Sequence, residues 1–143
     1  MLEQLITSFV ASCAFAIIFN CPKNALIKCG IIGVIGWMTY IYLIEWDINT
    51  VLANVMAAFI VAIVGQIFAR VYKMPLIIFI VAGIVPLVPG GVAYDAMRLF
   101  AENNYESAVQ LSANVLLLSG AIAIGLILSE VINQIYKKIR THH

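Results

Sequence analysis

Apolar residues fill five long runs of the chain, and short polar segments separate these runs. The runs cover residues 2–20, 25–46, 50–72, 75–99 and 108–136. Each has close to, or more than, the roughly 20 residues that an α-helix needs to cross a bilayer. A helix pairs its own backbone groups, and hydrocarbon offers them no other partners. The pattern therefore predicts an all-α membrane protein with five transmembrane helices in a single domain, residues 1–143.

The composition separates this chain from soluble proteins. Hydrophobic residues make up 64% of it and charged residues 10%, and the mean hydropathy is +1.05. Soluble domains typically have about 45–50% apolar and 25% charged residues. We therefore expect an integral, multi-pass protein of the cell membrane.

Basic residues gather in alternate segments between the runs. One side of the membrane would receive Lys23, Lys28, Arg70, Lys73, Lys137, Lys138 and Arg140. The other side would receive Arg98 as its only basic residue, with Glu3, Glu45, Asp47, Glu102 and Glu106. Because segments rich in Lys and Arg remain in the cytoplasm, we expect an external N-terminus and a cytoplasmic C-terminus.

The fourth run is interrupted about halfway by Pro86, Pro89, Gly90 and Gly91. A proline has no N–H to donate, so the helical hydrogen-bond ladder cannot continue unbroken through this segment. Within a membrane, such a break is tolerated only inside protein or beside a water-filled cavity. Broken helices near the midplane indicate the binding site of a transporter. We therefore predict a broken fourth helix with a substrate site at the break. The alternative is a proline kink that packs against neighbouring helices and binds nothing.

The break would offer two kinds of backbone group to a substrate. The carbonyls of Ala82 and Val85 lose their usual donors four residues on, and they could accept hydrogen bonds from an ammonium or hydroxyl group. A short helix restarting near Gly91 would present unpaired N–H groups and a positive dipole end to a carboxylate.

Polar side chains near the break extend this candidate site. Tyr94, Asp95 and Arg98 fall on one side of a continuing helix. Asp95 could hold a substrate ammonium or carry a coupled proton, or it could pair with Arg98 at the outer interface. Asn54 in the third run and Asn114 in the fifth could line the same cavity, or hydrogen-bond a neighbouring helix instead.

Small residues recur at helical spacing in the second and fifth runs, as Gly30, Gly33 and Gly36 and as Ala121, Gly125 and Ser129. Small residues let helix backbones approach closely in lipid. We interpret both stripes as packing surfaces.

Three motifs resemble the threonine/serine exporter family. They are Phe19-Asn20-Cys21-Pro22, the Gly33–Gly36 step, and Pro86-Leu87-Val88-Pro89-Gly90 followed by Tyr94 and Ala96-Met97. The resemblance is to the smaller module of that family and covers nearly the whole chain. It implies export of small hydrophilic metabolites such as threonine and serine, driven by the proton gradient, or of a dicarboxylate such as succinate. It also implies a larger membrane module as partner, so this chain looks like one subunit of a two-component exporter, with assembly into a homo-oligomer also open.

Other function classes have less support in the residues. A non-transporting assembly subunit remains an alternative, although a scaffold needs no break at the midplane. The sequence has no HExxH, no Walker A loop and no histidine before His142, so we do not expect an enzyme. Cys13, Cys21 and Cys29 form no CxxC and have no histidine or carboxylate cluster beside them. We expect no metal, no cofactor and no nucleic-acid partner.

Overall fold

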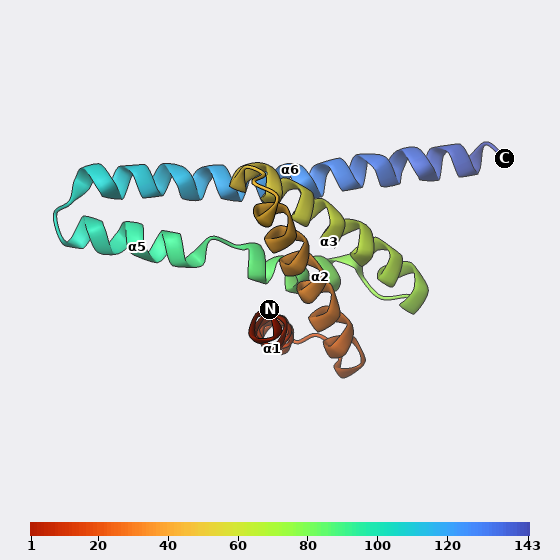
Figure 1. Cartoon of the computed structure of the whole chain (residues 1–143). Helices are drawn as coiled ribbons and strands as arrows, with labels where there is room; N and C mark the ends of the chain where they lie inside the picture. The colour runs from red at the N-terminus through yellow and green to blue at the C-terminus, as the bar shows by residue number, and fades with distance from the viewer.

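The computed structural model describes residues 1–143, and all of its regular elements are helices (Figure 1). In chain order they are α1 (Leu2–Ile18), η1 (Lys23–Ala25), α2 (Leu26–Glu45), α3 (Thr50–Tyr72), α4 (Leu76–Ile84), η2 (Val85–Leu87), α5 (Gly90–Ala101) and α6 (Tyr105–Thr141). The elements η1 and η2 are single 3₁₀ turns. The predicted all-α class is confirmed.

Four helices end at a residue in the left-handed backbone region. These residues are Asn20, Asp47, Lys73 and Asn103, with φ between 52° and 62°. A left-handed residue reverses the chain direction at a helix C-terminus, and Asn and Asp adopt this conformation more readily than most residues. At the other end of a helix, the Asn49 side chain accepts a hydrogen bond from the Val51 N–H at 2.9 Å and caps α3. The connections are therefore short turns with local causes.

Three helical segments are long and apolar enough to cross a membrane: Lys23–Glu45, Thr50–Tyr72 and Tyr105–Thr141. Leu76–Leu87 and Gly90–Ala101 meet the same standard together, as a pair bent by 55°. The helix α1 has 17 residues, which is about 25 Å at 1.5 Å per residue against a hydrocarbon core of about 30 Å. The structure thus supports three spans, or four if the bent pair is one span, and the predicted count of five is not confirmed.

The fifth predicted run is longer than we expected. The helix α6 begins at Tyr105 instead of residue 108 and continues to Thr141 instead of residue 136. The polar segment before it contributes its first turn, where the Glu106 carboxylate lies near the positive end of the helix dipole. Only Glu102, Asn103 and Asn104 remain as a loop between α5 and α6.

The core lies where α2, α3 and α4 meet, and small residues bring these helices together. A Cβ atom on Gly36 of α2 would lie 2.5 Å from Val61 of α3, and one on Gly83 of α4 would lie 2.7 Å from the same side chain. Val61 is fully buried as a result. About one turn earlier on α2, a Cβ on Gly33 would overlap the Ser12 side chain of α1. The predicted packing role of these α2 glycines is confirmed.

The helices α3 and α6 run parallel to each other, because their contacts advance together along both helices. Gly125 lies against the Val55 carbonyl and Ala58, and further along Gln66 donates to Ser129 at 3.0 Å. A Cβ on Gly125 would lie 2.4 Å from the Val55 oxygen, so only glycine permits this approach. Ala121, Gly125 and Ser129 are all buried, which confirms the predicted packing stripe on α6.

The remaining helix, α5, packs along the first half of α6 as an antiparallel hairpin that extends away from the other helices (Figure 1). Ala96 and Ala108 are buried in the interface of this hairpin. Apolar side chains such as Met97 and Leu116 remain exposed on its outside. The bend between α4 and α5 is what directs the hairpin away from the bundle.

Candidate functional site

The break in the fourth run occurs where the sequence predicts it. The helix α4 ends at Ile84, η2 forms one tight turn that contains Pro86, and Val88 is extended with φ −64° and ψ 129°. Pro89 then precedes α5, which begins at Gly90. The chain changes direction by 55° between the two halves.

Backbone groups at the break are only partly paired. The Val88 N–H lies 3.2 Å from the Ile84 carbonyl and 3.3 Å from the Val85 carbonyl. The Val85 carbonyl therefore has a replacement donor within the turn, which the sequence did not indicate. At the start of α5, the N–H groups of Gly91 and Val92 have no partner within the protein.

A cavity of about 240 Å³ lies directly beside the break. Its lining comes from α2, α3, α5, α6 and the break itself: Trp37, Tyr40, Asn54, Pro86, Leu87, Val88, Pro89, Gly91, Val92 and Leu118. One water takes about 30 Å³ of liquid volume, so this space corresponds to roughly eight waters. The cavity has the size of a small metabolite.

Asn54 is the polar side chain that α3 contributes to this cavity. The residue is only 3% exposed, and none of the side-chain hydrogen bonds in the structure involves its amide. Ser12 Oγ is the only fully buried side-chain polar atom without a partner, so the Asn54 amide retains a small accessible surface. The amide is therefore available to a molecule inside the cavity, together with the N–H groups of Gly91 and Val92. These three groups can bind a carboxylate or a hydroxyl group.

The structure brings together some of the predicted site residues and separates others. Asn54, Pro86, Pro89 and Gly91 line the cavity. The other predicted residues lie elsewhere: Ala82 is buried in the core, Val85 lies in the η2 turn, and Gly90, Tyr94, Asp95 and Asn114 are exposed. The polar residues of α5 and α6 thus do not join Asn54.

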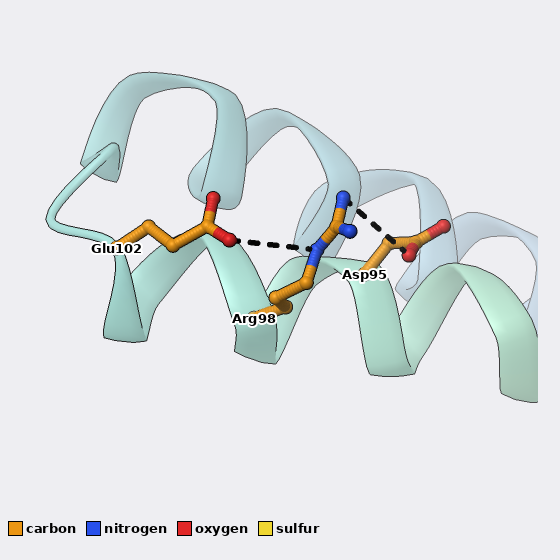
Figure 2. Close-up of polar contacts among 3 residues, drawn as sticks. All are labelled: Asp95, Arg98 and Glu102. Atoms are coloured by element: carbon orange, nitrogen blue, oxygen red, sulfur yellow. Dashed lines mark ion pairs between the residues drawn. The ribbon is translucent and has the colours of Figure 1, made fainter.

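Asp95 belongs to a row of charges on the exposed side of α5 (Figure 2). Its carboxylate lies 4.0 Å from the Arg98 guanidinium, which in turn lies 3.9 Å from the Glu102 carboxylate. The Asp95 side chain is 52% exposed. This arrangement matches the ion pair that the sequence left open as an alternative to a coupling site.

Two aromatic residues of α2, Trp37 and Tyr40, also line the cavity. The sequence analysis did not predict either of them as a site residue. The Trp37 and Tyr40 rings pack together with centroids 5.4 Å apart. Tyr40 is partly buried and lies in the second half of α2. Its spacing of three residues from Trp37 puts both on one helix face, beside the packing glycines, and that was the available signal for an inward position.

Comparisons with known proteins agree with the resemblance in the motifs. The family model described as Threonine/Serine exporter, ThrE, matches residues 4–132. An uncharacterized protein of Haemophilus influenzae is 28% identical over 136 residues, which cover 90% of this chain and 46% of that protein. The chain therefore spans about half the length of this curated relative. No solved structure matches the chain significantly.

Proposed function

Because the chain belongs to the threonine/serine exporter family, we propose that it is one subunit of a two-component secondary exporter of small hydrophilic metabolites, driven by the proton gradient. The observation that carries this proposal is the cavity at the helix break, where the Asn54 amide and two backbone N–H groups are unpaired. A kink that served packing alone would not need three hydrogen-bonding groups at one cavity.

In this proposal, a substrate carboxylate binds at the N-terminus of α5. The N–H groups of Gly91 and Val92 donate to its oxygens, and the helix dipole favours the negative charge. The Asn54 amide hydrogen-bonds the carboxylate or a hydroxyl group of the substrate. Pro89 and Pro86 keep the two helix halves apart, so the N-terminus stays free to bind.

The cavity lining favours an amino acid over a dicarboxylate. No Lys or Arg is among its residues, and a second carboxylate would need another positive group to replace its water. The faces of Trp37 and Tyr40 suit an ammonium group, which aromatic rings attract. A succinate-type substrate remains the second candidate, for which α5 would bind one end and the partner module the other.

The partner in this proposal is a larger membrane module of the same exporter. The Haemophilus influenzae relative is about twice as long as the matched region, which leaves room for such a module. Exposed apolar residues on the α5–α6 hairpin, among them Met97, Leu116 and Leu117, offer a surface for it. A second copy of this chain could use the same surface.

For the orientation, we propose that the basic end of the bundle faces the cytoplasm. Lys28 of α2 lies over the ring of Tyr72, at the end of α3. Arg70 of α3 donates to Asn133 of α6, close to the basic C-terminal segment. Basic residues of three elements thus gather at one end, and the positive-inside bias then gives an external N-terminus.

The experiment that tests the proposal is transport in liposomes containing this chain, with and without the larger module. Serine, threonine and succinate are loaded in parallel, and efflux is followed with and without an imposed proton gradient. We expect gradient-dependent efflux of serine or threonine when both components are present. A complex that moves none of the three at the same protein content would contradict an exporter role and favour an assembly subunit.

A further inference from the structure

A second cavity, separate from the helix break, lies between α3 and α6. Its volume is about 170 Å³, and its polar lining comes from Gln66, Arg70, Asn133 and Tyr136. Gln66 and Asn133 are each only 7% exposed. The cavity therefore brings polar side chains together with isoleucines, in a helix pair that is otherwise packed through small and apolar residues.

Hydrogen bonds fix the side chains around this cavity. Gln66 Nε2 donates to Ser129 Oγ at 3.0 Å, and the Arg70 guanidinium donates to Asn133 Oδ1. The centre of the guanidinium lies 5.7 Å from the centre of the Tyr136 ring, within the range of a cation–π interaction. These contacts position Arg70 at the cavity, and none of them neutralises its charge.

No carboxylate of the protein pairs with Arg70. Both ion pairs in the structure involve Arg98, and Glu130 of α6 instead accepts a hydrogen bond from Gln134 at 3.3 Å. A guanidinium has five N–H donors in a fixed fork that matches phosphate oxygens. The cavity thus presents a cation with free donors.

The surroundings favour an anion that also carries apolar chains. Lys73 follows directly at the end of α3, and further basic residues follow Tyr136 on α6, so the local potential is positive. Ile67 and Ile132 line the same cavity and are about half exposed. A ligand that fits both features has an anionic head and a hydrocarbon tail.

We propose that this cavity, the Arg70 pocket, binds the phosphate group of an anionic phospholipid. The guanidinium donates to the phosphate oxygens, while the acyl chains lie along Ile67 and Ile132. Basic pockets between membrane helices recognise lipid head groups in this manner. The site is independent of the proposed exporter cavity, because no residue lines both.

Native mass spectrometry of the purified full chain tests this proposal. The protein is offered phosphatidylglycerol and phosphatidylcholine in equal amounts, and bound lipid is counted for the parent, Arg70→Gln and Lys138→Gln. The control Lys138→Gln removes one charge from the same end of the protein but outside the pocket. We expect the parent and the control to bind phosphatidylglycerol in preference to phosphatidylcholine. In Arg70→Gln, the ratio of bound phosphatidylglycerol to bound phosphatidylcholine should be about tenfold lower. An equal loss in both variants, or no preference in the parent, would overturn the proposal.

Two further arms settle the source of the phosphate and the position of the lipid. Inorganic phosphate at a large excess should not displace phosphatidylglycerol, because it lacks the apolar chains; full displacement would assign the pocket to a soluble phosphate. A photoactivatable phosphatidylglycerol should label the parent protein at peptides containing Ile67 and Ile132. This arm needs no variant, so it remains decisive if Arg70→Gln does not fold, and labelling spread evenly over all helices would contradict the proposal.

Discussion

The ammonium nitrogen of Lys28 lies 3.5 Å from the centre of the Tyr72 ring. This contact joins the beginning of α2 to the end of α3, so basic residues far apart in the sequence share one end of the molecule. The helices α2 and α3 run antiparallel, and α6 runs in the same direction as α3. This arrangement agrees with loops that lie alternately on the two sides of the membrane. The contact thus links the charge pattern of the sequence to the three-dimensional arrangement.

The first prediction concerns orientation. In a variant lacking Cys13, Cys21 and Cys29, a thiol introduced at Asn104 should react with a membrane-impermeant reagent in intact cells, whereas a thiol at Thr141 should not. The physical reason is the retention of basic segments in the cytoplasm. Labelling at position 141 without labelling at position 104 would show that the topology is the reverse of the predicted one.

A second prediction concerns the broken helix. Pro89→Ala combined with Gly90→Ala restores an N–H and removes a flexible residue, which favours a continuous helix. We expect the double variant to insert and fold but to export at least about tenfold more slowly than the parent. Gly90→Ala alone is the matched control, since a Cβ at position 90 meets no atom within 4 Å. Parental export by a well-expressed double variant would show that the break has no role in transport.

The third prediction concerns Asp95. Its carboxylate lies on the exposed side of α5 with Arg98 and Glu102, and exposed ion pairs contribute only about 0–1 kcal/mol. Asp95→Asn should therefore leave both uphill export and energy-independent exchange close to parental rates in proteoliposomes. If uphill export failed while exchange continued, Asp95 would be a coupling residue.

A fourth prediction compares two glycines of α6. In Gly125→Ala, the new methyl group would meet the Val55 carbonyl at 2.4 Å, so α3 and α6 must separate. Overpacking of this kind typically costs about 1–3 kcal/mol. Gly120→Ala is the control, because a Cβ at position 120 meets open space and alanine favours the helix. The free energy of unfolding should be lower in Gly125→Ala than in the parent, and it should not be lower in Gly120→Ala. Equal values for the two variants would contradict the close contact between α3 and α6.

Local chemistry explains why parts of the fold could be predicted from the sequence. Pro86 and Pro89 remove N–H donors whatever surrounds them, so the break was predictable. Gly36 and Gly125 stand in helical stripes whose spacing indicates close packing. These features depend on neighbours along the chain.

The composition of the cavity could not be predicted in the same way. Whether Asn54 or Asn114 faces the break depends on the rotation of α3 and α6 about their axes, and both lie in similar apolar sequences. The 55° bend directs α5 away from the bundle, which moves Asp95 to the surface. Trp37 and Tyr40 reach the cavity because the glycines beside them bring α2 close to α1, α3 and α4.

The most direct test of the central claim compares Asn54→Leu with Asn114→Leu in proteoliposomes that contain the complete exporter. Both changes replace an amide by an apolar group of similar size, but only Asn54 lines the cavity at the break. Counterflow of labelled serine or threonine is measured at equal protein content. A hydrogen bond to a charged group contributes about 1.5–3 kcal/mol, so the apparent affinity of Asn54→Leu should fall about tenfold or more, while Asn114→Leu should match the parent. Equal counterflow in both variants would contradict a substrate site at this cavity.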